Sequence, residues 1–214
     1  MLESRHSVRA FLPTEVPDET LLRVLRLAQR APSWCNIQPW RVWLLSGDAR
    51  VRFARAMEEA ATARLPCPDV AFPGDYPEPY ASHRKACGKV LYEAMGVARD
   101  DGAARRAAWM RNFAAFDAPH VALVGIDQSF GLYGALDVGC WLEALMLAAH
   151  AEGLGTCAQA ALATFPDVAR QVAGIGDEVS ILFGVALGYE DPAAAANRAR
   201  TARQPVEDNV TFIR

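Results

Sequence analysis

Two arginines, a histidine and two serines lie close together at the start of the chain, in the stretch SRHSVRAF. Arg5, His6, Ser7 and Arg9 all precede the first helix that the sequence predicts. Arginine binds phosphate through pairs of charge-assisted hydrogen bonds, and a serine hydroxyl can donate another. The stretch therefore predicts an anion site suited to phosphate, with a solvated N-terminal arm as the alternative.

A second basic cluster lies near the other end of the chain. Arg198 and Arg200 come shortly before Arg203, which is followed by Pro205. If the two ends of the chain meet, these arginines add positive charge to the same phosphate site. The alternative is an ordinary basic tail that stays in solvent.

The third cluster is the segment RAPSWCNIQPW, Arg30–Trp40, which combines aromatic rings with uncharged hydrogen-bonding groups. Ser33, Asn36 and Gln38 lie beside Trp34, for which a buried loop anchor is one interpretation. Cys35 has no neighbouring helix N-terminus or basic partner that would favour its thiolate, so we do not expect it to act as a nucleophile.

Other motifs of known chemistry are absent from the sequence. It contains no GxGxxG after a predicted strand, no GxxxxGK[ST], no GxSxG and no HExxH. The four histidines are widely spread, and His120 and His150 sit in apolar contexts that favour satisfied core or edge positions. We expect neither a metal site nor a catalytic triad.

Composition indicates a well-packed, acidic protein. Of its 214 residues, 52% are hydrophobic and 22% charged, and the net charge is −3. Such a chain can bury a core and is not expected to bind nucleic acid, which would favour a basic surface. The five cysteines form no CxxC pair and are expected to be reduced thiols. With no signal peptide and an apolar stretch at Leu142–Ala149 that looks too short for a bilayer, we expect a cytoplasmic protein without membrane contact.

The elements that position these clusters follow from hydrophobic spacing. The first helix starts within Pro17–Thr20 and is ended by Pro32. The other predicted helices are Asp48–Ala63, Ser82–Met95, Ala103–Ala115, Leu136–Glu152 and Phe165–Val172. Strands are predicted at Arg41–Gly47, His120–Ile126, Glu178–Tyr189 and Val210–Ile213. Residues 1–214 are therefore expected to form a single α+β domain, with many helices around a modest sheet.

Three of these segments have a distinctive character. The run His120–Ile126 has no polar interruption and predicts a strand buried on both faces. Leu136–Glu152 is apolar nearly all round, which is typical of a helix in a core or at an oligomer interface. Five prolines between Leu65 and Tyr80 predict a long irregular loop, and Gly153 and Gly155 predict bends.

Taken in order, the motifs resemble the nitroreductase family of flavoproteins. The matching stretches are RHSVRAF, APSWCNIQPWRV, NFAAFDAP, GLGTCAQAAL, GVALGYEDP and NRARTARQPVEDNVTF, which together cover essentially the whole chain. Each motif alone is weak, whereas the ordered set is specific. Among subgroups, the chain most resembles the enzymes that reduce nitroaromatic acids such as nitrobenzoate.

The resemblance implies a nitroreductase-like α+β fold, with a central, mostly antiparallel sheet surrounded by helices. It also implies an intertwined homodimer with two FMN sites at the interface and a C-terminal extension that wraps the partner. The chemistry would then occur at flavin N5, with NAD(P)H as co-substrate, and no amino acid would need to act as a catalytic group.

The resemblance also assigns roles to individual residues. Arg5, Ser7 and Arg203 would hold the FMN phosphate with His6 nearby, and Arg9 would approach the pyrimidine edge, where a guanidinium stabilises reduced flavin. Pro32, Ser33, Trp34 and Asn36 would reach the flavin from the other subunit. Gln159 and Ala160 would line the far side of the ring, and Asn112 its edge. The family often has Lys or Arg two residues before the Arg203 position, where this chain has Thr201, so Arg200 is an alternative phosphate ligand.

The expected activity is an NAD(P)H-dependent, FMN-containing oxidoreductase that reduces small nitroaromatic or quinone substrates by a ping-pong hydride mechanism. Trp34 and the 65–80 loop would form walls of the substrate pocket. Two alternatives remain open: a specialised flavoenzyme on the same scaffold (a dehydrogenase, a dehalogenase or an ene-type reductase), or a non-catalytic module that binds flavin or another anion.

Overall fold

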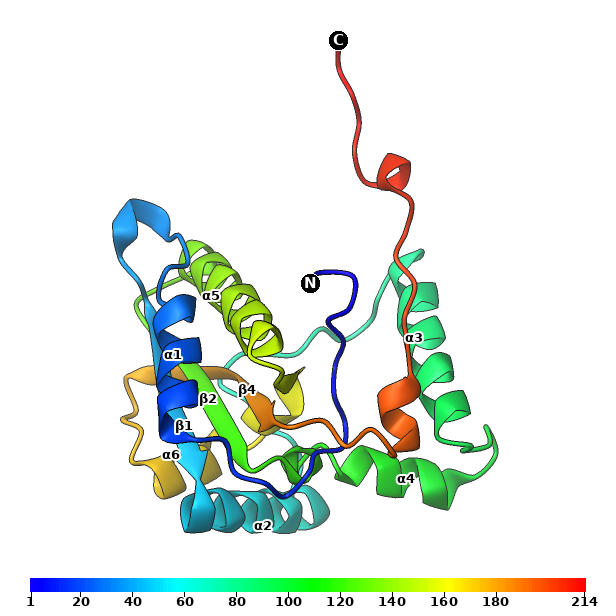
Figure 1. Ribbon diagram of the computed structural model, residues 1–214, viewed down its shortest axis with the longest axis horizontal. Helices are drawn as coiled ribbons and strands as arrows, with labels where there is room; N and C mark the ends of the chain where they lie inside the picture. Colours follow the sequence, from blue (N-terminus) through cyan, green and yellow to red (C-terminus); the bar gives the residue numbers. More distant parts are fainter.

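A four-stranded antiparallel sheet forms the centre of the protein, which is described by a computed structural model of residues 1–214 (Figure 1). The strands lie in the order β1 (Trp40–Ser46), β2 (His120–Asp127), β4 (Val179–Gly188) and β3 (Gly155–Gln159). Every strand pair is antiparallel. The predicted α+β class and the antiparallel sheet are confirmed.

Strand β2 is buried on both faces, as its apolar sequence predicts. Val121 and Leu123 point into one hydrophobic cluster, whereas Ala122 and Val124 point into a second cluster on the opposite face. Successive side chains of a strand alternate between faces, so an uninterrupted apolar run serves both layers.

Two helices cover each face of the sheet. On one side α1 (Asp18–Ala28) packs against α5 (Leu132–Ala151), and on the other α2 (Gly47–Ala63) packs against α6 (Pro166–Ala173) (Figure 1). The first helix ends at Ala28, before Pro32, and Gly174 stops α6 in the left-handed conformation that glycine accepts most readily. The sheet therefore lies between two layers of helices, α1 with α5 and α2 with α6.

A third pair of helices lies to the side of this sandwich. Neither α3 (Tyr80–Ala94) nor α4 (Gly102–Met110) has a buried residue, and α3 contacts the 3-10 turn η4 (Ala195–Arg198) near the end of the chain. Figure 1 shows α3 standing apart from α5. The proline-rich segment before α3 contains no helix or strand, as predicted.

Helix α5 begins four residues earlier than predicted and has 20 residues. Helix α5 as a whole, unlike the stretch Leu142–Ala149 alone, is long and apolar enough to pass a length and composition test for a membrane span, a test that core helices of soluble proteins also pass. Trp141 and Leu145 are buried in the core, whereas Leu132, Tyr133 and Leu136 are exposed on this chain.

Three other predictions of secondary structure need correction. The segment around Gly155 forms strand β3 rather than only bends, because it pairs with β4 along its whole length. Val210–Ile213 is not a strand, since the tail has no partner strand within the chain. Helix α4 ends at Met110 instead of Ala115, where the chain enters the 3-10 turn η2 (Ala115–Asp117) with left-handed φ angles.

Candidate functional site

The N-terminal arm lies against the edge of β3. Ser7 forms an isolated parallel bridge with Thr156, and the Val8 N–H donates to the Thr156 carbonyl oxygen at 3.0 Å. Gly155 permits this approach, because a Cβ atom there would lie only 2.6 Å from Val8 Cγ2. Two segments about 150 residues apart are thus joined, and the charged arm is carried to the end of the sheet.

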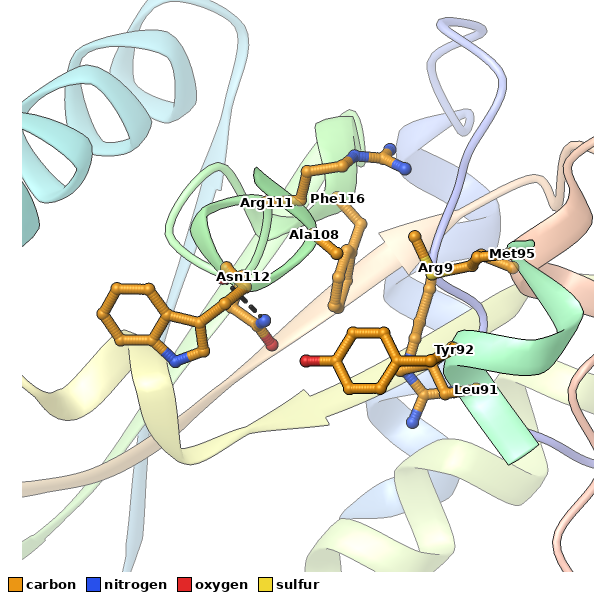
Figure 2. Close-up of a pocket in the computed structure, with 10 residues that line it drawn as sticks. Arg9, Leu91, Tyr92, Met95, Ala108, Arg111, Asn112 and Phe116 are labelled. Carbon is orange, nitrogen blue, oxygen red and sulfur yellow. Dashed lines mark hydrogen bonds between the residues drawn. The ribbon is translucent and has the colours of Figure 1, made fainter. Parts of the chain in front are cut away.

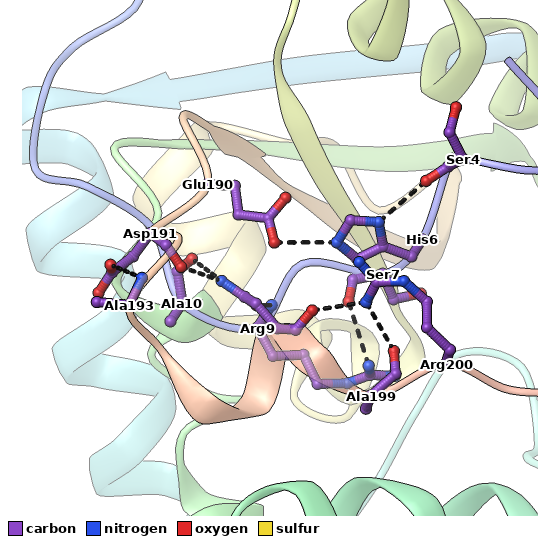
Figure 3. A network of polar contacts seen from close by, with 11 residues as sticks. Ser4, His6, Ser7, Arg9, Ala10, Glu190, Asp191, Ala193, Ala199 and Arg200 are labelled. Carbon is purple, nitrogen blue, oxygen red and sulfur yellow. Dashed lines mark hydrogen bonds and ion pairs between the residues drawn. The ribbon is translucent and has the colours of Figure 1, made fainter.

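Buried Asn197 ties the next part of the arm to the C-terminal region. Figure 3 draws Arg9 and Ala10 of the arm in one view with Ala199 and Arg200. Its Oδ1 accepts from the Arg9 N–H at 2.7 Å, and its Nδ2 donates to the Ala10 carbonyl oxygen at 2.8 Å. Arg200 Nη1 donates to the Asn197 carbonyl oxygen at 2.6 Å. The structure therefore connects Arg200 with the arm. Arg203 instead is exposed and donates to Thr201, so within one chain it is not brought to Arg5.

His6 pairs with a carboxylate that the sequence analysis did not identify. Its Nε2 lies 3.0 Å from Glu190 Oε1, just after β4. Both residues line a cavity with Arg5, His150 and Thr156. The contact with His6 thus occupies one carboxylate oxygen of Glu190 in the cavity that Arg5 also lines.

The side chains of the arm converge on Cys157 of β3. Burial raises the pKa of Cys157 to about 11, while the nearby Arg9, Ser7 and Arg5 partly oppose this shift. The thiol therefore stays neutral at physiological pH and is not a nucleophile. Arg5, Ser7 and Arg9 therefore lie around one point of the sheet.

Two buried polar atoms at this site have no hydrogen-bond partner. One is Arg5 Nε and the other is Gln159 Oε1 at the end of β3. Gln159 Nε2 is already used, since it donates to the Asn112 carbonyl oxygen at 3.0 Å and lies 3.4 Å from Asn112 Oδ1. Buried polar groups are rarely left unpaired, so a free donor and a free acceptor point to a polar ligand.

A cavity beside Arg9 and Asn112 is walled by aromatic rings (Figure 2). The rings belong to Tyr92 of α3, Trp109 of α4 and Phe116 of η2. In the close-up the Tyr92 hydroxyl points toward the Asn112 side chain. The cavity thus combines flat apolar walls with two arginines, Arg9 and Arg111, and one amide, which suits an aromatic ligand with a polar edge.

The Pro32–Asn36 segment lies at the opposite end of α5. The Trp34 N–H donates to both carboxylate oxygens of buried Asp137, at 3.1 and 3.2 Å, whereas His150 of the same helix bonds Ser4 beside the arm. Thirteen residues separate Asp137 from His150 (150 − 137), or about 20 Å of helix. One chain therefore does not bring this segment to the Arg5 cluster.

The Trp34 side chain is not the buried anchor considered from the sequence. It is 61% exposed, and its ring centroid lies 5.2 Å from that of Tyr133. Ser33 accepts from the Gln38 N–H, while Pro32 and Asn36 are exposed. The loop is instead anchored through its backbone, by Asp137, and presents its ring outward.

Of the remaining candidates, Ala160 is exposed directly after Gln159, at the start of the 3-10 turn η3 (Ala160–Ala163). The prediction that His120 is a satisfied core histidine is confirmed, because Val16 N–H donates to Nε2 and Nδ1 lies 2.6 Å from Ser46 Oγ. His150 bonds Ser4 Oγ at 2.7 Å. All five cysteines are free, and Cys35 is exposed.

Comparison with known proteins gives concordant matches. The sequence profile of the Nitroreductase family matches residues 2–189. Nitroreductase NfnB of Mycolicibacterium smegmatis is 36% identical over 219 residues, covering 100% of this chain and 92% of that protein. A 4-nitrobenzoate reductase of Nocardioides sp. is 33% identical over 227 residues, covering 100% and 88%. The crystal structure of the FMN-dependent nitroreductase NfnB from Mycobacterium smegmatis in complex with NADPH superposes with a TM-score of 0.96 at 34% identity, covering 100% of this chain and 96% of that chain.

Proposed function

This chain belongs to the nitroreductase family, and on that basis we propose that it is an FMN-dependent oxidoreductase that uses NAD(P)H to reduce nitroaromatic or quinone substrates. Its Mycobacterium smegmatis relative is FMN-dependent and has been crystallised with NADPH. Another full-length relative is named for the reduction of 4-nitrobenzoate. These relatives favour NADPH as the hydride donor and a nitroaromatic compound as the oxidant.

The observation that carries this proposal is the pair of unpartnered buried atoms, Arg5 Nε and Gln159 Oε1. FMN offers what both lack, since its phosphate accepts hydrogen bonds and its pyrimidine ring has an N–H donor. The phosphate carries about two negative charges, which an acidic protein must meet with local cations. Arg5, Arg9 and the nearby Arg200 provide them, so the residues present fit the cofactor.

Each residue at the site would have a separate task. Arg5 and the Ser7 hydroxyl would hold the phosphate, with Arg200 as the additional cation. Arg9 would stabilise negative charge at the pyrimidine edge, and Gln159, fixed by Asn112, would accept from that edge. His6 would keep Glu190 paired.

The bound flavin would supply the redox chemistry, taking a hydride from NAD(P)H and passing it to the second substrate in ping-pong order. The chain would contribute orientation and exclusion of water. The aromatic walls of the α3–α4 cavity and the 65–80 loop would surround the substrate, and neutral Cys157 would not compete for it. No side chain needs to act as a nucleophile or as a general base.

We also propose that residues 1–214 form one domain that works as a homodimer in the cytoplasm. The Trp34 loop is distant from the Arg5 cluster of its own chain, so its partner subunit would receive it. The tail after Arg200 projects away from the body and exposes Phe212 and Ile213, which suits wrapping around a second chain (Figure 1). Arg203 belongs to this tail, so it would act at the partner subunit instead of beside Arg5 of its own chain. A monomeric mass in sedimentation equilibrium would refute the dimer.

The proposed activity is best tested by a panel of oxidants in a stopped-flow instrument. Protein loaded with FMN and reduced anaerobically by NADPH or NADH is mixed with nitrobenzoate, a quinone, an enone or an iodophenol. We expect nitrobenzoate and the quinone to reoxidise the flavin fastest. Faster reoxidation by the enone or the iodophenol would favour a specialised flavoenzyme, and loading without reduction by either dinucleotide would favour a binding module.

A further inference from the structure

The turn between α4 and β2 holds three consecutive non-glycine residues in the left-handed region. The φ angles are 50° at Ala115, 53° at Phe116 and 64° at Asp117. Residues with a Cβ atom are strained in this region, and such strain persists only where surrounding contacts fix it. Contacts from outside the turn must therefore stabilise this conformation.

Arg50 of α2 stabilises the turn by hydrogen bonds to the residues on both sides of it. Its Nε donates to the Ala118 carbonyl oxygen at 2.7 Å, and its Nη2 donates to the Ala114 carbonyl oxygen at 2.9 Å. The side chain is only 14% exposed, and a carboxylate oxygen of Asp117 lies 3.9 Å from its Nη2. Burial lowers the pKa of Arg50, so this charge is held at a cost that the two carbonyl bonds offset.

The 115–117 turn also fixes the positions of residues in the candidate flavin site. The Asn112 carbonyl oxygen accepts from the Ala115 N–H at 3.1 Å as well as from Gln159 Nε2 at 3.0 Å. The Phe116 N–H donates to the Arg111 carbonyl oxygen at 3.0 Å, and the Phe116 ring lines the same cavity as Asn112 (Figure 2). A shift of the turn would move the Asn112–Gln159 pair and the aromatic wall together.

We propose that Arg50 is a positioning residue for the flavin site, which holds the 115–117 turn so that Asn112 and Gln159 meet the edge of the ring. This role rests on the proposed function, because the ligand that the pair meets is FMN. Arg50 itself touches neither the cavity nor the arm. Its guanidinium spans two carbonyl oxygens four residues apart, which the single nitrogen of lysine does not reproduce.

The test compares Arg50→Lys with Arg52→Lys, an exposed neighbour on α2. In the apoprotein, amide hydrogen exchange over residues 112–118 should accelerate in Arg50→Lys alone. FMN titration followed by flavin fluorescence should then show affinity reduced on the order of tenfold in Arg50→Lys and unchanged in Arg52→Lys. If Arg50→Lys does not fold, the double variant Arg50→Lys/Asp117→Gly, in which glycine relieves the left-handed strain, is compared with Asp117→Gly alone and should bind FMN more weakly than that single variant.

The outcomes separate this inference from the proposed function. If exchange accelerates while FMN affinity stays the same, or if neither changes, Arg50 does not position the site and the inference is overturned. If the wild-type apoprotein does not bind FMN, the proposed function is wrong, and Arg50 then has no role in positioning a flavin site. Acceleration together with weaker binding, confined to Arg50→Lys, supports the inference.

Discussion

At the scale of single residues, the site depends on side chains that have spare hydrogen-bonding capacity. Arg5 Nε and Gln159 Oε1 are both buried without hydrogen-bond partners. Types and spacing in the sequence are enough to single out Arg5, Ser7 and Arg9. Asn197, Glu190 and Arg50 are not predictable in this way, because each acts on a segment about 70 to 190 residues away.

His120 makes stability depend on pH. Burial lowers its pKa from the usual 6.5, so at mildly acidic pH the unfolded chain binds a proton that the folded chain does not. The stability that neutral His120 adds to the folded state is fully present above about pH 6.5. Below that pH it declines, by at most about 1.4 kcal/mol per pH unit. Urea unfolding of the apoprotein between pH 7.5 and 5.5 should show this slope.

The variant His120→Gln should flatten that slope, because it removes the titrating group while leaving an acceptor near the Val16 N–H. His83→Gln, which replaces an exposed histidine on α3, is the matched control and should keep the wild-type slope. Carboxylates with lowered pKa values, such as Asp127 and Glu152, act at lower pH. An unchanged slope in His120→Gln would show that another group is responsible.

At the scale of elements, the sequence predicts a strand well where the strand forms because its side chains are buried. It predicts a strand poorly where the strand forms because a neighbouring strand is available to pair with it. The apolar pattern of β2 is sufficient, because both of its faces are covered. Strand β3, GTCAQ, lacks such a pattern and forms because β4 offers it an edge. Val210–Ile213 has strand propensity without a neighbour in the chain, so propensity alone predicted the wrong structure.

The contact between the arm and β3 predicts a specific effect of Gly155→Ala. The new Cβ atom would lie 2.6 Å from Val8 Cγ2 and 3.0 Å from Val8 Cβ, so the arm must move away from the sheet. We expect a loss of about 1–3 kcal/mol in stability, faster exchange of the Val8 amide and weaker FMN binding. Hydrogen exchange and flavin titration measure these changes.

Two companion variants decide whether the contact is the cause. Val8→Ala in the Gly155→Ala background removes the clashing methyl groups and should recover much of the lost affinity. Gly88→Ala on α3, where nothing lies within 4 Å of the new atom, should behave like the wild type. Equal losses in Gly155→Ala and Gly88→Ala would contradict the proposed close approach.

At the scale of the whole molecule, the two sets of residues that we propose to meet the flavin lie at opposite ends of α5 within one chain. The basic arm, Cys157 and Gln159 lie near its C-terminal end, whereas the Trp34 loop, fixed by Asp137, lies near its beginning. The projecting tail and the exposed Leu132, Tyr133 and Leu136 leave apolar surface without cover. A two-fold pairing of chains would bring these two sets of residues together, and only the family resemblance predicted such an arrangement.

The central claim is that the arm docked on β3 forms the phosphate end of a flavin site. The most direct measurement is FMN titration of the apoprotein for wild type, Arg5→Ala and Arg198→Ala, the last being an exposed arginine from the other basic cluster. Loss of a charge-assisted bond to phosphate should weaken binding about 10- to 100-fold in Arg5→Ala, with Arg198→Ala unchanged. Wild-type affinity in Arg5→Ala, or equal losses in both variants, would contradict the claim.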